Sequence, residues 1–248
     1  MRAFWTLWRR ELAAYFLSPI AYVMMIFFLA VFGLSFWLLV NVLVDGVVGA
    51  SPMKELFGSI FFWLAVLIVV PVLTMRLLAE ETRSGTLETL MTAPVTDLAV
   101  VAAKLAGAAT FYIVLWLPTV TYAFVLKRFS PLSAPMDFGP MLSGYLGALL
   151  IGWFFLSVGL FCSALTSNQI AAAITCFALI GSFFFAGFFA FLARSDAVRD
   201  AAGYVSSVMH MLDFSRGVVD TRPIVLYVSA TVFMLFLAVR VLESRRWR

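Results

Sequence analysis

The chain has 248 residues, of which 64% are apolar and 12% charged, and its 17 Lys and Arg against 13 Asp and Glu give a formal net charge of +4. Soluble domains carry about half apolar and roughly a quarter charged residues, so the composition excludes an ordinary soluble domain and predicts an all-α, polytopic membrane protein. The apolar runs follow one another too closely for a soluble domain to fit between them. We therefore expect one membrane domain over residues 1–248, without a removable signal peptide.

The first 18 residues predict a helix that lies in the membrane plane. Arg2, Arg9 and Arg10 fall largely away from a set of apolar and aromatic side chains at helical spacing, which comprises Phe4, Leu7, Trp8, Leu12, Tyr15 and Phe16. Such a helix places its rings at headgroup depth and its arginines near anionic lipid. Ser18 and Pro19 end it, because proline fits the first turn of a new helix. The helix is either simply an anchor or also a contact for a cytoplasmic partner.

Six apolar runs reach the length of about 20 residues that a membrane-spanning helix needs. They cover residues 20–43, 57–79, 98–126, 142–165, 170–193 and 224–242. Six spans put both termini on one side, and ten of the 17 Lys and Arg residues fall on that side. The positive-inside rule then places both termini and residues 80–97 in the cytoplasm. Residues 194–222 form an outer segment, in which we expect short amphipathic helices, with a lid over an exit as one hypothesis.

The segment 80–97 is too polar to lie in lipid and predicts a short structured loop. Arg76 can pair with Glu80 one helical turn on. Gly85 permits a backbone break that other residues resist. Asp97 can cap the helix of the third span.

Within this loop the pattern predicts a helix of about two turns. Thr86 can cap it, and Pro94 ends it because the residue before proline is pushed out of helical geometry. One apolar face is formed at positions i, i+3 and i+4 by Leu87, Leu90 and Met91. Such a face either docks into a groove on a partner or packs back on its own spans.

Four stretches carry a resemblance to a known family: EETRSGTLETLMTAPV at residues 80–95 with Lys104 ten residues after the proline, RRELAAYFLSPIAYV at 9–23, LTSNQIAAA at 165–173 and DFSRGVVDT at 213–221. They occur in order over the whole chain, which resembles the permease subunits of type 2 ATP-binding-cassette (ABC-2) transporters, most closely the gliding-motility-associated type. In that family a coupling helix between the second and third spans contacts a separate ATPase.

The resemblance implies two ATPase subunits, which bind ATP and Mg, and a second permease copy or a homologous permease. It also implies an ATPase-coupling role for a set of loop residues, namely Glu80, Glu81, Arg83, Gly85, Thr86, Leu87, Glu88, Leu90, Met91, Thr92 and Pro94. The chain itself has no G-x-x-x-x-G-K-[ST] phosphate loop. We expect it to bind no cofactor and to be a non-catalytic subunit.

Other functional patterns are weaker. His210, Cys162 and Cys176 do not form the set of three or four ligands that zinc requires, and no Ser-His-Asp set can be assembled. The spans carry no charged residue at mid-membrane, where proton relays and ion sites place one.

Three function classes follow. The first is the permease of an exporter in a bacterial cytoplasmic membrane. The second is a mechanotransmission or assembly subunit that drives an extracytoplasmic auxiliary protein without carrying solute, and the third is a channel or secondary carrier. No span carries a pattern that identifies a substrate.

Overall fold

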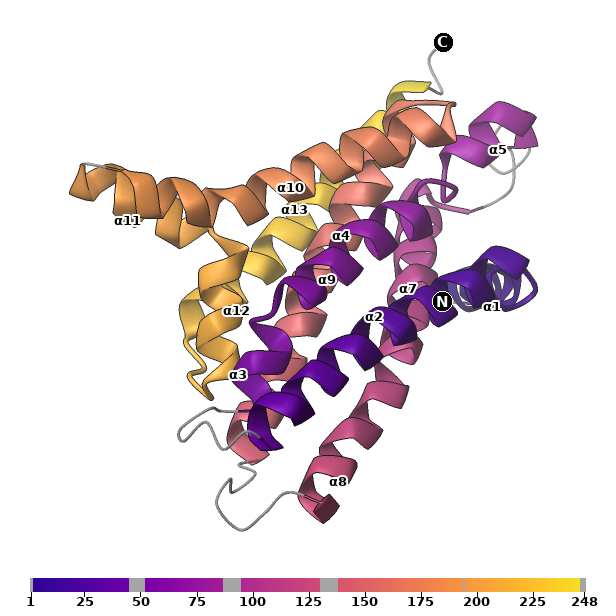
Figure 1. Ribbon diagram of the computed structural model, residues 1–248. Helices are drawn as coiled ribbons and strands as arrows, with labels where there is room; N and C mark the ends of the chain where they lie inside the picture. The colour runs from indigo at the N-terminus through magenta and orange to yellow at the C-terminus, as the bar shows by residue number, and fades with distance from the viewer. Residues whose placement is uncertain (1, 45–51, 87–94, 130–137, 194, 246–248) are drawn as a thin grey trace.

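The computed structural model describes residues 2–44, 52–86, 95–129, 138–193 and 195–245 (Figure 1). Over these residues every regular element is a helix. Their order is α1 (Arg2–Phe16), α2 (Pro19–Val44), α3 (Pro52–Phe57), α4 (Ile60–Thr74), α5 (Ala79–Ser84), α7 (Asp97–Trp116), the 3-10 turn η1 (Leu117–Thr119), α8 (Val120–Phe129), α9 (Phe138–Leu165), α10 (Gln169–Leu192), α11 (Asp196–Val205), α12 (Ser207–Ser215) and α13 (Thr221–Arg245).

Six helical segments in the described part of the chain are long and apolar enough to cross a membrane, as the sequence predicted. They cover Pro19–Leu43, Ile60–Ser84, Asp97–Leu126, Phe138–Leu165, Gln169–Phe189 and Thr221–Ser244. The chain is therefore an all-α, multi-pass membrane protein. One end of the bundle holds α1, α5 and both ends of the described chain (Figure 1). The opposite end holds α3, α12 and the end of α8. We call these the terminal end and the far end.

The fourth span, α9, occupies the centre of the bundle and contacts α4, α7, α10, α12 and α13. Its glycines make this packing possible. A Cβ at Gly152 would overlap the ring of Tyr112 on α7, and one at Gly159 would overlap the side chain of Thr74 on α4. These small residues of α9 thus allow the neighbouring helices to approach closely.

The interfacial helix α1 packs against α7 at the terminal end. The two backbones approach closely at Gly107, where a Cβ would lie 2.9 Å from the Cβ of Glu11. Trp8 Nε1 donates a hydrogen bond to Thr110 Oγ1 (3.2 Å). The helix ends at Phe16 and α2 begins at Pro19, as the proline rule predicts.

Several expected boundaries differ from the structure. The second span begins at Ile60 rather than Phe57, because the Ser59 side chain caps α4 and Phe57 instead ends the short helix α3. Thr96 rather than Asp97 caps α7, with its hydroxyl accepting from the backbone N–H of Ala99. The third span is not one regular helix, because η1 carries Pro118 and separates α7 from α8.

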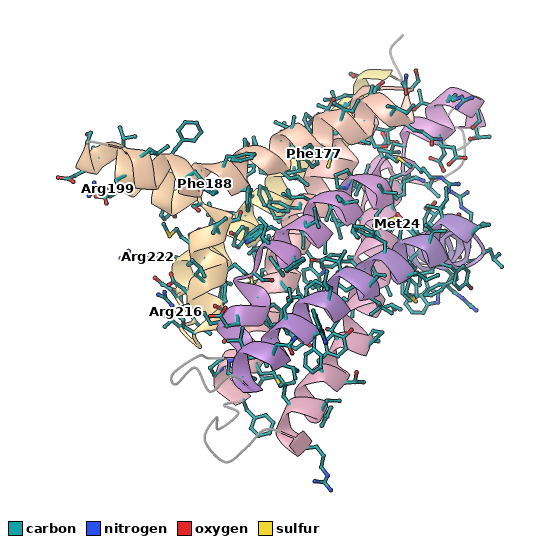
Figure 2. All side chains as sticks on the ribbon, in the orientation of Figure 1. Met24, Phe177, Phe188, Arg199, Arg216 and Arg222 are labelled. Carbon is teal, nitrogen blue, oxygen red and sulfur yellow. The ribbon has the colours of Figure 1, made fainter. Side chains whose placement is uncertain are left out.

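The segment expected to carry short amphipathic helices contains α11 and α12. Helix α12 packs on α9, whereas α11 contacts α10 and has no buried residue. Helix α11 and the adjoining end of α10 project from the bundle, with Phe188 and Arg199 labelled on this projection in Figure 2.

Candidate functional site

A buried lysine joins three helices at the terminal end of the bundle. Lys104 lies in the second turn of α7, and its side chain is only 3% exposed. Its Nζ is 3.0 Å from Glu11 Oε1 on α1 and 2.9 Å from Glu81 Oε1 on α5. A buried ammonium is very costly unless it is paired, so the two carboxylates are what allows Lys104 to occupy this position.

Arg10 completes this arrangement from the exposed side. Its Nη2 lies 3.1 Å from Glu11 Oε1 and 3.2 Å from Glu81 Oε1. Two cations thus share two carboxylates, and we refer to Arg10, Glu11, Glu81 and Lys104 as the charged cluster. Glu81 Oε2 is buried and has no hydrogen-bond partner among the described residues. The cluster fixes α5, from which the polar loop leaves, against both α1 and α7.

A second set of contacts ties α5 to the turn between α1 and α2. Arg76 Nε lies 2.9 Å from Glu80 Oε2, the pair that the sequence predicts. Arg76 Nη1 also donates to Ser18 Oγ (3.2 Å). The Tyr15 hydroxyl donates to the carbonyl of Leu73 at the end of α4 (2.8 Å), and burial raises the pKa of this hydroxyl well above its ordinary value. It therefore remains a donor at any physiological pH.

The second span is interrupted between α4 and α5, and a serine of α9 holds the interruption. The buried Ser163 hydroxyl accepts from the backbone N–H groups of Leu78 and Ala79, both at 3.0 Å. It also donates to the carbonyl of Met75 (3.2 Å). Buried backbone N–H and C=O groups need hydrogen-bond partners. The Ser163 hydroxyl is the partner of three such groups at the interruption, two N–H groups and one carbonyl.

Five of the predicted coupling residues lie within the described chain. Glu80 and Glu81 are held as above, and Arg83 on the same helix is exposed. Gly85 caps α5 with φ of 72°, in the left-handed region that favours glycine. Thr86 is exposed and its hydroxyl lies 2.8 Å from that of Ser84.

The remaining predicted coupling residues lie outside the described residues, so the apolar face of the predicted coupling helix stays a prediction. These residues are Leu87, Glu88, Leu90, Met91, Thr92 and Pro94.

Sequence reasoning missed the role of Glu11, Arg10 and Ser163. A signal for Glu11 was present, because Lys104 is the one charge beyond the first turn of an apolar helix and needs a carboxylate. No sequence signal identifies which of several serines lies beside the break in the second span.

The described residues contain no group of three or more His, Cys, Asp or Glu side chains that could hold a metal. Cys162 and Cys176 are buried free thiols. His210 is buried at the far end, with its Nδ1 2.9 Å from the hydroxyl of Tyr227. Burial lowers the pKa of His210, and the nearby carboxylates of Asp213 and Asp220 oppose this shift.

The six membrane-length helices of the described residues define a multi-pass membrane protein. Residues 44–215 match the family model described as ABC-2 family transporter protein, and the chain belongs to this family. It is thus a permease subunit of an ABC transporter, of a kind that is generally non-catalytic and partners with ABC ATPase subunits. None of the curated proteins compared with the chain matches it.

Proposed function

We propose that this chain is the permease of an ATP-driven exporter in a bacterial cytoplasmic membrane. In this proposal both termini and the segment 80–97 face the cytoplasm, two ATPase subunits bind ATP and Mg, and residues 86–94 form the coupling helix. The observation that carries the proposal is the pairing of Glu81 with Lys104. The helix at which the loop begins is thereby fixed to α7 and, through Glu11, to α1.

The contacts support a mechanical route from the loop to the spans. Closure of the ATPases moves the coupling helix. The short helix α5 moves with it, because only Gly85 lies between the end of α5 and Thr86, where the coupling helix begins. The charged cluster passes this displacement to α1 and α7. Ser163 passes it to α9 at the break after Met75. The two six-span bundles then rock against each other and change which side of the membrane a central path faces.

A second permease copy, or a homologous permease, is proposed to pair along α10. This helix exposes a row of phenylalanines, including Phe177 and Phe188, that point away from the bundle (Figure 2). They line an open apolar hollow of about 590 Å³ together with Gly181 and Ser182. A second apolar helix would cover this hollow, and the small residues allow a close approach.

The projection formed by α11 and the end of α10 favours a second candidate function. Helix α11 has no buried residue, and the projection extends beyond the bundle at the far end (Figure 1). In the gliding-motility-like alternative, this projection contacts an extracytoplasmic auxiliary protein. ATP hydrolysis would then move that protein without solute crossing the membrane.

The coupling proposal is tested by Leu87→Asp and Glu88→Lys in the permease–ATPase complex. Both variants should retain the membrane fold but lose the link between ATP turnover and transport in vesicles. Glu243→Lys is the matched control, because Glu243 is an accessible carboxylate near the end of α13, paired only with Arg240 among the described residues. Full coupling in both loop variants would overturn the role of residues 86–94.

The same vesicles separate the two candidate functions. Export predicts ATP-dependent movement of solute across the membrane. The alternative predicts ATP turnover that rises when an outer partner is added, with no movement of solute.

A further inference from the structure

A cavity of about 90 Å³ lies where α1, α2, α4 and α5 meet. Its apolar side is formed by α2 and α4, with Ala21, Met24, Val72 and Leu73 among the lining residues. Met24 lies between these two helices in Figure 2. Its polar side is formed by Glu11, Ser18, Arg76 and Glu80. The cavity therefore has one apolar and one polar side, which suits an amphiphilic ligand.

The polar side lies at the terminal end of the bundle, where the membrane-length helices end and we expect the lipid headgroups. Ser18 belongs to the turn where the chain passes from the interfacial helix α1 to the span α2. Arg76 donates to Ser18 Oγ, so the guanidinium lies at the same level. From there the apolar side continues into the membrane along α4, where Leu64 and Ile68 precede Val72 at intervals of four residues and are exposed.

The charged side chains at this cavity are paired but not saturated. Arg76 uses Nε for Glu80 and Nη1 for Ser18, and no described residue accepts from its Nη2. Glu80 uses Oε2 for Arg76, and no described residue donates to its Oε1. Their side chains are 37% and 47% exposed. A ligand with a neighbouring anion and ammonium can therefore bind both without breaking the Arg76–Glu80 pair.

We propose that this cavity binds an aminophospholipid, with the lipid phosphate on Arg76 and the ammonium on Glu80. The acyl chains follow the row of Leu64, Ile68 and Val72. Phosphatidylethanolamine fits this chemistry because its ammonium carries three N–H donors for a carboxylate. The quaternary ammonium of phosphatidylcholine has no N–H donor, and phosphatidylglycerol has no cation. The site requires no ATPase and is independent of the coupling proposal.

The test uses the purified full-length chain and native mass spectrometry after exchange into an equimolar mixture of phosphatidylethanolamine, phosphatidylcholine and phosphatidylglycerol. One phosphatidylethanolamine should be retained preferentially. Arg76→Gln should weaken this retention by about tenfold or more, because the lipid phosphate loses a charged hydrogen-bond donor. Arg83→Gln is the control: Arg83 lies seven residues further along the chain, on α5 and outside the cavity lining, so this variant should leave retention unchanged.

A second variant tests the proposal in case Arg76→Gln fails to fold. Ala14 is exposed and borders the cavity, so Ala14→Trp should cover the opening and abolish selective retention while leaving the Arg76–Glu80 pair intact. Equal retention of phosphatidylcholine or phosphatidylglycerol would overturn the proposal, as would unchanged retention in Ala14→Trp. Complete displacement by an equal concentration of glycerophosphoethanolamine would overturn the lipid assignment, and failure of this soluble headgroup to compete would support it.

Discussion

Lys104 on α7 and Glu81 on α5 form an ion pair of 2.9 Å in which the lysine is 3% and the carboxylate 18% exposed. The pair joins the third span to α5, the last helix of the second span, at the point where the chain leaves the bundle. Breaking a buried pair from one side leaves the other charge without compensation, which costs about 3–5 kcal/mol.

Lys104→Gln should lower the free energy of unfolding by about 3 kcal/mol, because Glu11 and Glu81 keep only Arg10 as a cationic partner. Thermal unfolding in detergent measures the change. The double variant Glu81→Gln with Lys104→Gln should cost less than the sum of the two single variants. Lys54→Gln is the control, since no ion pair joins Lys54 to another described residue. Additive single effects would contradict the pairing.

Ser163→Ala should speed amide exchange at Leu78 and Ala79, because both N–H groups lose their acceptor. An unsatisfied buried group costs about 1–3 kcal/mol. Hydrogen exchange with mass spectrometry measures the change. Ser157→Ala is the matched control: Ser157 is equally buried in α9 but only donates to Phe154 within its own helix. Equal effects of the two variants would show that Ser163 has no special role at the break.

Gly159→Ala should destabilise the bundle by about 1–3 kcal/mol through overpacking. The added Cβ would meet the Cβ of Thr74 at 2.6 Å, and Thr74 is itself buried. In contrast, Gly181→Ala on α10 meets nothing within 4 Å and should be neutral or slightly stabilising, since alanine favours a helix. Unfolding temperatures of the two variants, measured side by side, check the contrast.

The far end should lose stability as the pH falls. Burial lowers the pKa of His210 below its ordinary value of 6.5, so the unfolded state binds more protons than the folded state in the interval between the two values. The stabilisation is complete above about pH 6.5 and declines as the pH falls toward the folded-state pKa. Amide exchange in α12 between pH 5 and 8 measures this effect. His210→Gln should flatten the profile, and an unchanged slope would contradict it.

The six spans could be predicted because each is an apolar run of membrane length, and the start of α2 because proline favours a first helical turn. The left-handed cap at Gly85 and the Arg76–Glu80 pair are local, so neighbouring residues suffice to predict them. Helical spacing likewise predicted α1.

The features that were missed depend on contacts between distant parts of the chain. The interruption at residues 75–78 contains no glycine that could have indicated it, and its hydrogen bonds are supplied by Ser163 on α9. Glu11 and Lys104 are 93 residues apart, and their pairing depends on how closely α1 approaches α7 at Gly107. Thr96 and Asp97 are both good capping residues, and only the backbone path decides between them.

The interruption between α4 and α5 determines to which helices a force on the polar loop is transmitted. A continuous helix would act as a rod and deliver a pull along the axis of the second span. Here the peptide groups at the break are bonded sideways to Ser163, so part of any pull on α5 arrives transversely on α9. Because α9 contacts seven other helices of the described chain, namely α3, α4, α5, α7, α10, α12 and α13, a small tilt of α9 would be transmitted to most of the bundle at once.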